Sequence, residues 1–272
     1  MSAAPALLEV DLGQGVRAAF TTAEPDPAQP DGAAHNLSLV LGDDESRVLA
    51  RRAGLEVWAG VPIAYPHQVH GAQVHVCRNP PTSQEPVAVA DALVTTVDTL
   101  ALAVLVADCV PVLLADERAG VVAAVHAGRQ GVVAGVVPAA VAVMVAQGAL
   151  AGRIRAAVGP AVCGRCYDEP ADLRREVDAA VPGTASTTSW GTPALDLPAA
   201  VTRQLTSCGV GQIGAVGGCT LTDERWFSHR GSSPDGSRRP SGRFAGVVRL
   251  LPPSAGAGSS VACRRSGAGA RG

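Results

Sequence analysis

The stretch LALAVLVADCVPVLLADERAGVVAAVHAGRQG, residues 100–131, decides which fold this sequence can form. Two apolar runs flank the polar pair Asp108-Cys109, and a turn leads from the second run to a β-branched run that ends at His126. The loop 128–131 contains glycine and precedes a long stretch of Ala and Val. Strand, turn, strand, loop and helix in this order are typical of an α/β core. Cys109 and His126 are therefore expected at or near strand ends.

The composition is that of a globular protein with a large core. The chain has 272 residues, of which 47% are hydrophobic, and a mean hydropathy of +0.21. Because only 3% are aromatic, the core must be built from Val, Leu and Ala. We predict one α/β domain over residues 1–251, with a mixed β-sheet flanked by helices and a metal site in a cleft at strand ends. The tail 252–272 is rich in Ser, Gly, Ala and Arg and is predicted to be disordered.

Further strands and helices are indicated outside the central stretch. The uncharged segment 132–150 contains Pro138 and Gln147, and we interpret it as a buried helix rather than a membrane span. The remaining predicted strands are 16–22, 73–77 and 154–158, and the remaining predicted helices are 43–53, 171–180 and 198–208.

The net charge bears on possible partners, and the cysteine content bears on the redox environment. The net charge is −2 and all 22 basic residues are Arg, so no general basic field exists to attract nucleic acid or an anionic membrane. Neither partner is predicted. Seven cysteines in a chain whose first residues lack a secretory pattern favour reduced thiols and a cytoplasmic location.

One cysteine and two histidines suggest a metal centre. Cys109, His126 and the His70 of a Gln-Val-His-Gly motif each lie at the edge of a strand-like run. A thiolate and two imidazoles suit zinc, and three protein ligands leave one coordination position open, as a catalytic site requires. Each residue alone also has a structural interpretation, since a buried Cys often serves as a small hydrophobe. His67 and His75 compete with His70, and spacing alone does not choose among them.

Three other features bear on the function. Asp108 ends an apolar run, where a carboxylate needs a hydrogen-bonding role. The Cys163-Gly-Arg-Cys166 sequence has the spacing of half a zinc site or of a redox dithiol. It has no second CxxC partner, so we interpret these cysteines as structural or pocket-lining thiols. The loop at 128–131 could bind an anion through its backbone amides, with Arg129 adding charge.

The ordered set of motifs resembles one protein family. Its three marker motifs are matched around His70, Cys109 and His126. This family was long described as multicopper polyphenol oxidases or laccases and was later reinterpreted as purine nucleoside phosphorylases with adenosine deaminase activity. The resemblance covers about residues 15–251 and extends to Asn36-Leu37-Ser38-Leu39, Gly159-Pro160, Cys166-Tyr167, Cys219-Thr220, Phe227-Ser228-His229-Arg230 and Gly242-Arg243-Phe244-Ala245-Gly246.

The resemblance implies a zinc-dependent enzyme in which His70, Cys109 and His126 bind the metal and form the catalytic centre, with copper as the alternative metal. The implied reactions are phosphorolysis of adenosine, inosine, guanosine and methylthioadenosine, and deamination of adenosine. Arg230, Arg129 and Asn36 are the predicted substrate-binding residues, and purine nucleosides and phosphate are the predicted partners.

The chain departs from the family pattern at two places. The usual His-Ala-Gly-Trp-Arg-Gly reads His-Ala-Gly-Arg-Gln-Gly from His126, so the Trp is absent and Arg129 stands one position early. The usual Tyr-Arg-Arg reads His229-Arg230-Gly231, which keeps one Arg of two. An altered substrate preference is therefore expected.

Three alternative functions fit the residues to different degrees. A cysteine hydrolase would use Cys109 as nucleophile and a His as base, which fits relatives linked to editing of peptidoglycan precursors. A polyphenol oxidase would need several copper sites, for which the six His of the whole chain are too few. A zinc-stabilised binding domain would favour a closed site with four ligands.

Overall fold

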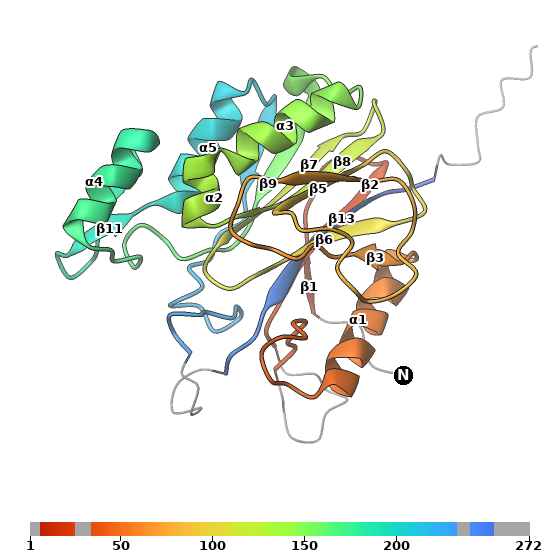
Figure 1. Cartoon of the computed structure of the whole chain (residues 1–272), viewed down its shortest axis with the longest axis horizontal. Helices are drawn as coiled ribbons and strands as arrows, with labels where there is room; N and C mark the ends of the chain where they lie inside the picture. Colours follow the sequence, from red (N-terminus) through yellow and green to blue (C-terminus); the bar gives the residue numbers. More distant parts are fainter. Residues whose placement is uncertain (1–5, 25–33, 233–239, 253–272) are drawn as a thin grey trace, which may run out of the picture.

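Two stacked β-sheets form the centre of the molecule (Figure 1). The computed structural model describes residues 6–24, 34–232 and 240–252, so the predicted disordered tail lies outside the described residues except for its first member. The five-stranded sheet has the order β1-β2-β13-β6-β3, and the six-stranded sheet has the order β12-β9-β7-β8-β5-β4. The predicted class, a single α/β domain with mixed sheets and flanking helices, is confirmed.

The strands of the two large sheets and of a small third sheet are β1 (Leu7–Glu9), β2 (Val16–Thr21), β3 (Ile63–Ala64), β4 (Val74–Cys77), β5 (Ala92–Thr95), β6 (Ala101–Val106), β7 (Val110–Asp116), β8 (Val121–Ala127), β9 (Arg155–Val158), β10 (Ala185–Thr187), β11 (Pro193–Leu195), β12 (Gln212–Ala215) and β13 (Phe244–Leu250). The helices are α1 (Glu45–Ala59), α2 (Arg129–Ala134), α3 (Val136–Ala146), α4 (Ala171–Ala180) and α5 (Leu197–Ser207), with a 3₁₀ turn at Ala151–Arg153.

The central strands are apolar on both faces because each sheet is covered on both faces. In β8, Val121, Ala123 and Val125 pack toward the helices, while Val122 and Ala124 pack toward the other sheet. Side chains of a strand alternate between its two faces, so a continuous apolar run is the pattern of a strand with two buried faces. The layers are therefore α1, the five-stranded sheet, the six-stranded sheet, and the group α2, α3 and α5 (Figure 1).

The helices follow the sequence pattern with two differences. The Asp44 side chain accepts the N–H of Arg47 at 3.0 Å and caps α1, which continues to Ala59, beyond the predicted end at residue 53. The long Ala/Val segment 132–150 was predicted as one helix, but Gly135 adopts a φ of +82° and divides it into α2 and α3. This conformation suits glycine, which has no Cβ.

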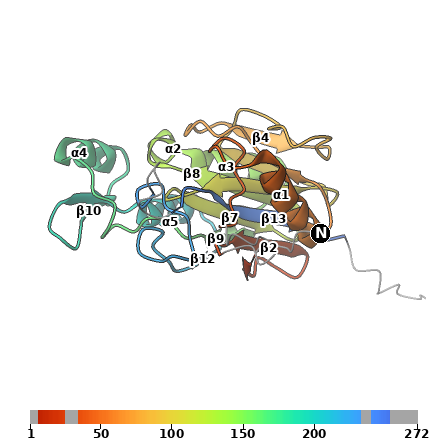
Figure 2. The ribbon, with the colours of Figure 1, turned by 90° about the horizontal axis from the view of Figure 1, so that it is seen from below.

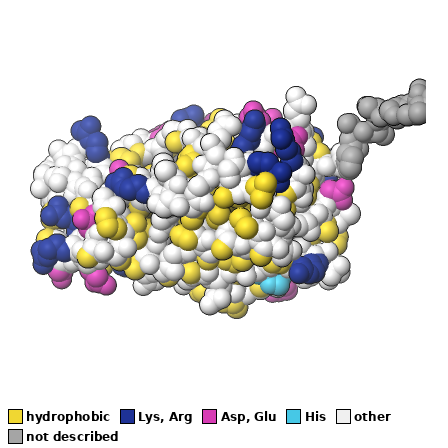
Figure 3. Space-filling view, turned by 90° about the horizontal axis from the view of Figure 1, so that it is seen from above, with side chains coloured by type: hydrophobic (Ala, Val, Ile, Leu, Met, Phe, Trp, Pro, Cys, Tyr) yellow, Lys and Arg dark blue, Asp and Glu magenta, His cyan; other side chains and the backbone are white. Residues whose placement is uncertain are grey.

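The described residues contain no candidate membrane-spanning helix, and the face drawn in Figure 3 carries no large basic region. None of the helices in the described part of the chain has both the length and the apolar character needed to cross a bilayer. On the face seen in Figure 3, basic side chains lie in small separate groups among apolar and uncharged ones. The unit of α4 with β10 and β11 extends from one end of the sheets, as Figure 2 shows.

Candidate metal centre

The register of the β7–β8 hairpin brings two of the predicted ligands together. Val110 at the start of β7 pairs with Ala127 at the end of β8, so Cys109 lies beside the end of the strand that carries His126. The third residue, His70, comes from the loop between β3 and β4. Residues far apart in the sequence therefore meet where the central strands β7 and β8 of the six-stranded sheet begin and end, respectively.

The donor atoms of His70, Cys109 and His126 form a compact group. One ligand atom from each lies within 4.8 Å of the other two, and His70 Nε2 is 3.8 Å from Cys109 Sγ. Zinc bonds of about 2.0–2.3 Å in a tetrahedron keep N and S ligands roughly 3.6 Å apart, so the donor set fits zinc with small adjustments. His67 and His75, the two rival ligands, do not belong to this group among the described residues.

Asp91 holds both imidazole ligands in place. Its Oδ1 accepts the backbone N–H of His70 at 2.9 Å and pairs with Nδ1 of His126 at 2.8 Å. Its Oδ2 accepts the N–H of Gly71 at 2.7 Å and of Val69 at 3.2 Å. Because Nδ1 of His126 is engaged by the carboxylate, Nε2 is left as the atom that can face a metal. Asp91 has no assigned role in the sequence analysis.

Backbone strain is concentrated at this centre. His70 has a φ of +59° and Asp108 a φ of +80°, and among the described residues they are the two non-glycine positions with positive φ. Such conformations cost free energy and persist only where neighbours enforce them. The Asp108 carboxylate accepts Thr220 Oγ1 at 2.6 Å and the N–H of Arg230 at 2.8 Å, which fixes the turn before Cys109.

The electrostatics of this centre favour a charged pair of Cys109 and His126. Burial opposes ionisation of the Cys109 thiol, but the charge and hydrogen bond of His126 and the hydrogen bond of His70 lower its pKa to about 6. Burial likewise opposes protonation of His126, but Cys109 and Asp91 raise its pKa to about 9. A thiolate is thus present at neutral pH, which is the form that binds a metal.

Gly128 leaves the space that the ligands need. A Cβ built on Gly128 would lie 2.7 Å from Cδ2 of His70 and 3.1 Å from Sγ of Cys109. No real Cβ contact is that short to a ring atom, so any side chain at this position must displace His70.

We expect Gly128→Ala to lower zinc affinity at the His70–Cys109–His126 site by at least about 10-fold, because a displaced ligand disrupts the donor set. Competition against a zinc indicator measures the change. Gly152→Ala is the control, since nothing lies within 4 Å of a Cβ there. Equal affinities for the two variants would contradict this account of Gly128.

The centre opens into a cleft with a volume of about 960 Å³. His70, Cys109 and His126 line it together with the four arginines Arg52, Arg129, Arg230 and Arg243. Such a volume is in the range of small-molecule sites.

The four arginines differ in the hydrogen bonds that their guanidinium groups form with other residues. Arg230 donates to the Asp168 carboxylate at 2.8 Å and to Glu169 at 2.5 Å, and its guanidinium stacks 4.3 Å from the centroid of the Tyr167 ring. Arg52 donates to the Leu37 carbonyl at 2.9 Å.

Arg243 and Arg129 have no carboxylate partner among the described residues. Arg243 donates to the Gly242 carbonyl at 2.8 Å, and burial lowers the pKa of its guanidinium, against the opposing charges of Cys109 and Asp108. The predicted substrate residue Asn36 is buried, and its Oδ1 accepts the N–H of Arg243 at 2.9 Å. Asn36 therefore positions the backbone of Arg243, a residue of the Gly242–Gly246 motif.

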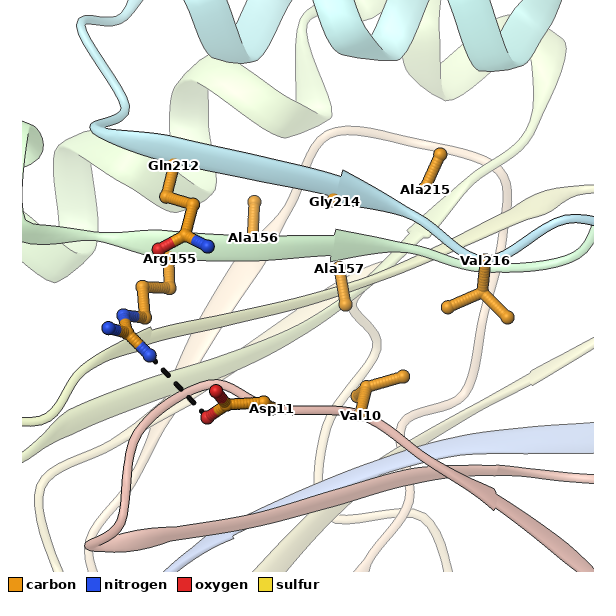
Figure 4. A pocket seen from close by; sticks show the side chains of 9 residues that line it. All are labelled: Val10, Asp11, Arg155, Ala156, Ala157, Gln212, Gly214, Ala215 and Val216. Atoms are coloured by element: carbon orange, nitrogen blue, oxygen red, sulfur yellow. Dashed lines mark hydrogen bonds and ion pairs between the residues drawn. The ribbon is translucent and has the colours of Figure 1, made fainter.

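A smaller hollow of about 190 Å³ shares no lining residue with this cleft (Figure 4). It lies along β9 and β12, and Arg155 and Asp11 form an ion pair of 3.4 Å across it. Its other labelled side chains are uncharged, and four of them are Ala or Gly. It lacks the convergent nucleophilic and basic groups found in the larger cleft.

Fold and site together define an α/β protein with a candidate metal centre of three donor side chains at the strand ends. The sequence model of the multi-copper polyphenol oxidoreductase laccase family matches residues 17–251. The chain belongs to this family, as its motifs predict.

Named relatives and a solved structure agree with this membership. The chain is 49% identical over 218 residues to a purine nucleoside phosphorylase of Streptomyces griseus, which covers 79% of this chain and 86% of the relative. It is 39% identical over 142 residues to an adenosine deaminase from an unknown prokaryotic organism, covering 49% of this chain and 54% of the relative. The crystal structure of a Neisseria meningitidis protein of the DUF152 family superposes with a TM-score of 0.77 at 28% identity, covering 90% of this chain and 99% of that one.

Proposed function

We propose that this chain is a zinc-dependent purine nucleoside phosphorylase that also deaminates adenosine. Its substrates are adenosine, inosine, guanosine and S-methyl-5'-thioadenosine, which react with phosphate to give the free base and a pentose 1-phosphate. The observation that carries the proposal is the open His70–Cys109–His126 donor set inside a cleft of about 960 Å³. The proposal is also supported by the Streptomyces griseus relative, which is named a purine nucleoside phosphorylase.

One set of residues would bind the metal ion and another set would bind the phosphate. His70, Cys109 and His126 hold the zinc ion, which supplies Lewis acidity beside the substrate when bound. In phosphorolysis the bond between the base and C1' of the pentose breaks, a bond from C1' to a phosphate oxygen forms, and the base leaves with a proton. Arg243 and Arg129 are the cleft cations free to hold phosphate for this attack. Deamination consumes water instead of phosphate and releases ammonia.

A second candidate function rests on one specific observation. Asp91, His126 and Cys109 form a carboxylate–imidazole–thiol series, and its imidazole lowers the pKa of the Cys109 thiol to about 6, against the effect of burial. This arrangement is that of a cysteine hydrolase, in which the thiolate attacks and the imidazole donates a proton to the leaving group. The two candidates differ in their requirement for metal.

The test uses purified protein with inosine or adenosine. We expect hypoxanthine and ribose 1-phosphate from inosine only when phosphate is present, and inosine from adenosine without it. A chelator should stop both reactions and added zinc should restore them. His126→Ala should lose both activities, while His75→Ala in β4 should keep them. Full activity of the metal-free protein would favour the cysteine hydrolase instead.

A further inference from the structure

Three other cysteines form a cluster separate from the His70–Cys109–His126 site. The sulfur atoms of Cys163, Cys166 and Cys219 all lie within 4.8 Å of one another, and none of the three is in a disulfide. Cys166 is buried, and Cys163 and Cys219 are partly exposed. The cluster joins the CxxC motif to Cys219, which lies more than fifty positions away in the sequence. The third thiol therefore comes from a single cysteine and not from a second CxxC motif.

A tight turn presents the first two thiols on one side. The N–H groups of Cys166 and Tyr167 both donate to the carbonyl of Cys163, at 2.9 and 3.0 Å. Gly164 lies inside this turn, and a Cβ there would be 2.7 Å from Cβ of Asp196. The turn is therefore packed closely against the start of α5, which limits its freedom.

The third thiol is brought in by backbone pairing. Cys219 forms a parallel bridge with Ala161, and the N–H of Thr220 donates to the Ala161 carbonyl at 3.1 Å. The N–H of Cys163 points at Sγ of Cys219, at 3.4 Å. A backbone N–H that donates to a ligand atom is a common way to fix a metal ligand from outside its coordination shell.

We propose that Cys163, Cys166 and Cys219 form a second metal site, which binds zinc through three thiolates. Zinc–sulfur bonds of about 2.3 Å place the sulfur atoms of a tetrahedral site roughly 3.8 Å apart, so sulfurs within 4.8 Å need to move by about 1 Å or less. Partial exposure of Cys163 and Cys219 leaves solvent access for a fourth ligand.

A cation would also offset the charge of three thiolates placed this close together. Three thiolates at this spacing repel one another unless a cation lies between them. When zinc binds, thiols that are still protonated would lose their protons to the solvent.

The site would join two segments of the cleft wall. Thr220 follows Cys219 and donates to the Asp108 carboxylate at 2.6 Å, and Asp108 precedes Cys109. Tyr167 follows Cys166 and lines the cleft. A zinc ion here would hold both segments in place and would take no direct part in the chemistry.

The first experiment counts zinc in protein loaded with zinc under reducing conditions and then freed of excess metal. We expect about two zinc ions per native chain and about one in the Cys163→Ser/Cys219→Ser variant and in His126→Ala. Cys208→Ser is the matched control, since Cys208 is also partly exposed but belongs to neither cluster, and it should keep about two. Equal zinc in the native and double-variant proteins would overturn the proposal without affecting the His70–Cys109–His126 site.

The second experiment needs no substitution, so it stands even if the double variant fails to fold. Maleimide labelling of the native protein, read by peptide mass, should leave Cys163, Cys166 and Cys219 unmodified when zinc is bound. Chelation should then make Cys163 and Cys219 react at least about 10-fold faster, because their thiolates are released. A rate that does not depend on zinc, or a disulfide within the cluster of the reduced and zinc-loaded protein, would refute it.

Discussion

Substitution of Asp91 by Asn should weaken zinc binding at the His70–Cys109–His126 site by about 10- to 100-fold, the usual effect of losing an outer partner of metal ligands. The Asp91 carboxylate accepts three backbone N–H groups and Nδ1 of His126. An Asn of the same shape turns one acceptor oxygen into a donor, so at least one N–H in the turn at His70 then faces another donor. Zinc affinity and nucleoside phosphorolysis are the measurements, and both should fall together.

The control for Asp91→Asn is Asp116→Asn. Asp116 is also buried, and its carboxylate accepts the N–H groups of Ala119 and Leu150 at 3.1 and 2.9 Å and the side chain of Arg153. Both variants should lower the free energy of unfolding, since an unpaired buried donor costs about 1–3 kcal/mol. Only Asp91→Asn should lower zinc affinity. If both variants keep native zinc affinity, Asp91 supports the fold alone.

The three candidate ligands could be predicted from the sequence because each stands beside a strong local pattern. Cys109 directly precedes the apolar run that forms β7, and His126 lies at the end of the run that forms β8. Both runs have the pattern of buried strands, and the turn that joins them is short. The choice of His70 over His67 and His75 came from the resemblance, and the structure places its Nε2 3.8 Å from Cys109 Sγ. Asp91 carried a weaker signal, a carboxylate immediately before the buried strand β5.

The role of Asp91 depends on contacts that no local pattern encodes. The N–H of His126 donates to the Asp91 carbonyl at 2.7 Å, which brings β5 and β8 together at the end where the ligands meet. That pairing joins positions 35 residues apart. A buried carboxylate predicts a hydrogen-bonding role, but its partners follow only from the strand register.

The sheet arrangement was predictable only in class. Apolar runs indicated buried strands and the helices between them, but not their division into two sheets. The last strand, β13, lies between β2 and β6, and Phe244 at its start pairs with Val106. Its two neighbours come from opposite ends of the first half of the chain, so this order depends on packing between distant segments.

Substitution of Arg243 by Ala should raise the KM for phosphate in inosine phosphorolysis by about 10- to 150-fold, since a charge-assisted contact to an anion contributes about 1.5–3 kcal/mol. Arg243 lines the cleft, is partly buried and has no carboxylate partner among the described residues. Arg230 is one of the substrate-binding residues predicted from the sequence. Its guanidinium is engaged by Asp168 and Glu169, so an anion would have to compete with two carboxylates for it.

The comparison of Arg243→Ala with Arg230→Ala distinguishes an anion contact from a structural one. Adenosine deamination uses no phosphate, so loss of Arg243 should leave its rate within about 3-fold of native if the residue binds only the anion. Loss of Arg230 should lower both reactions alike, because it releases Asp168, Glu169 and the ring of Tyr167 from one wall of the cleft. Arg118→Ala, in the exposed turn between β7 and β8, should change neither reaction. A phosphate KM that rises only in Arg230→Ala would return the anion contact to Arg230.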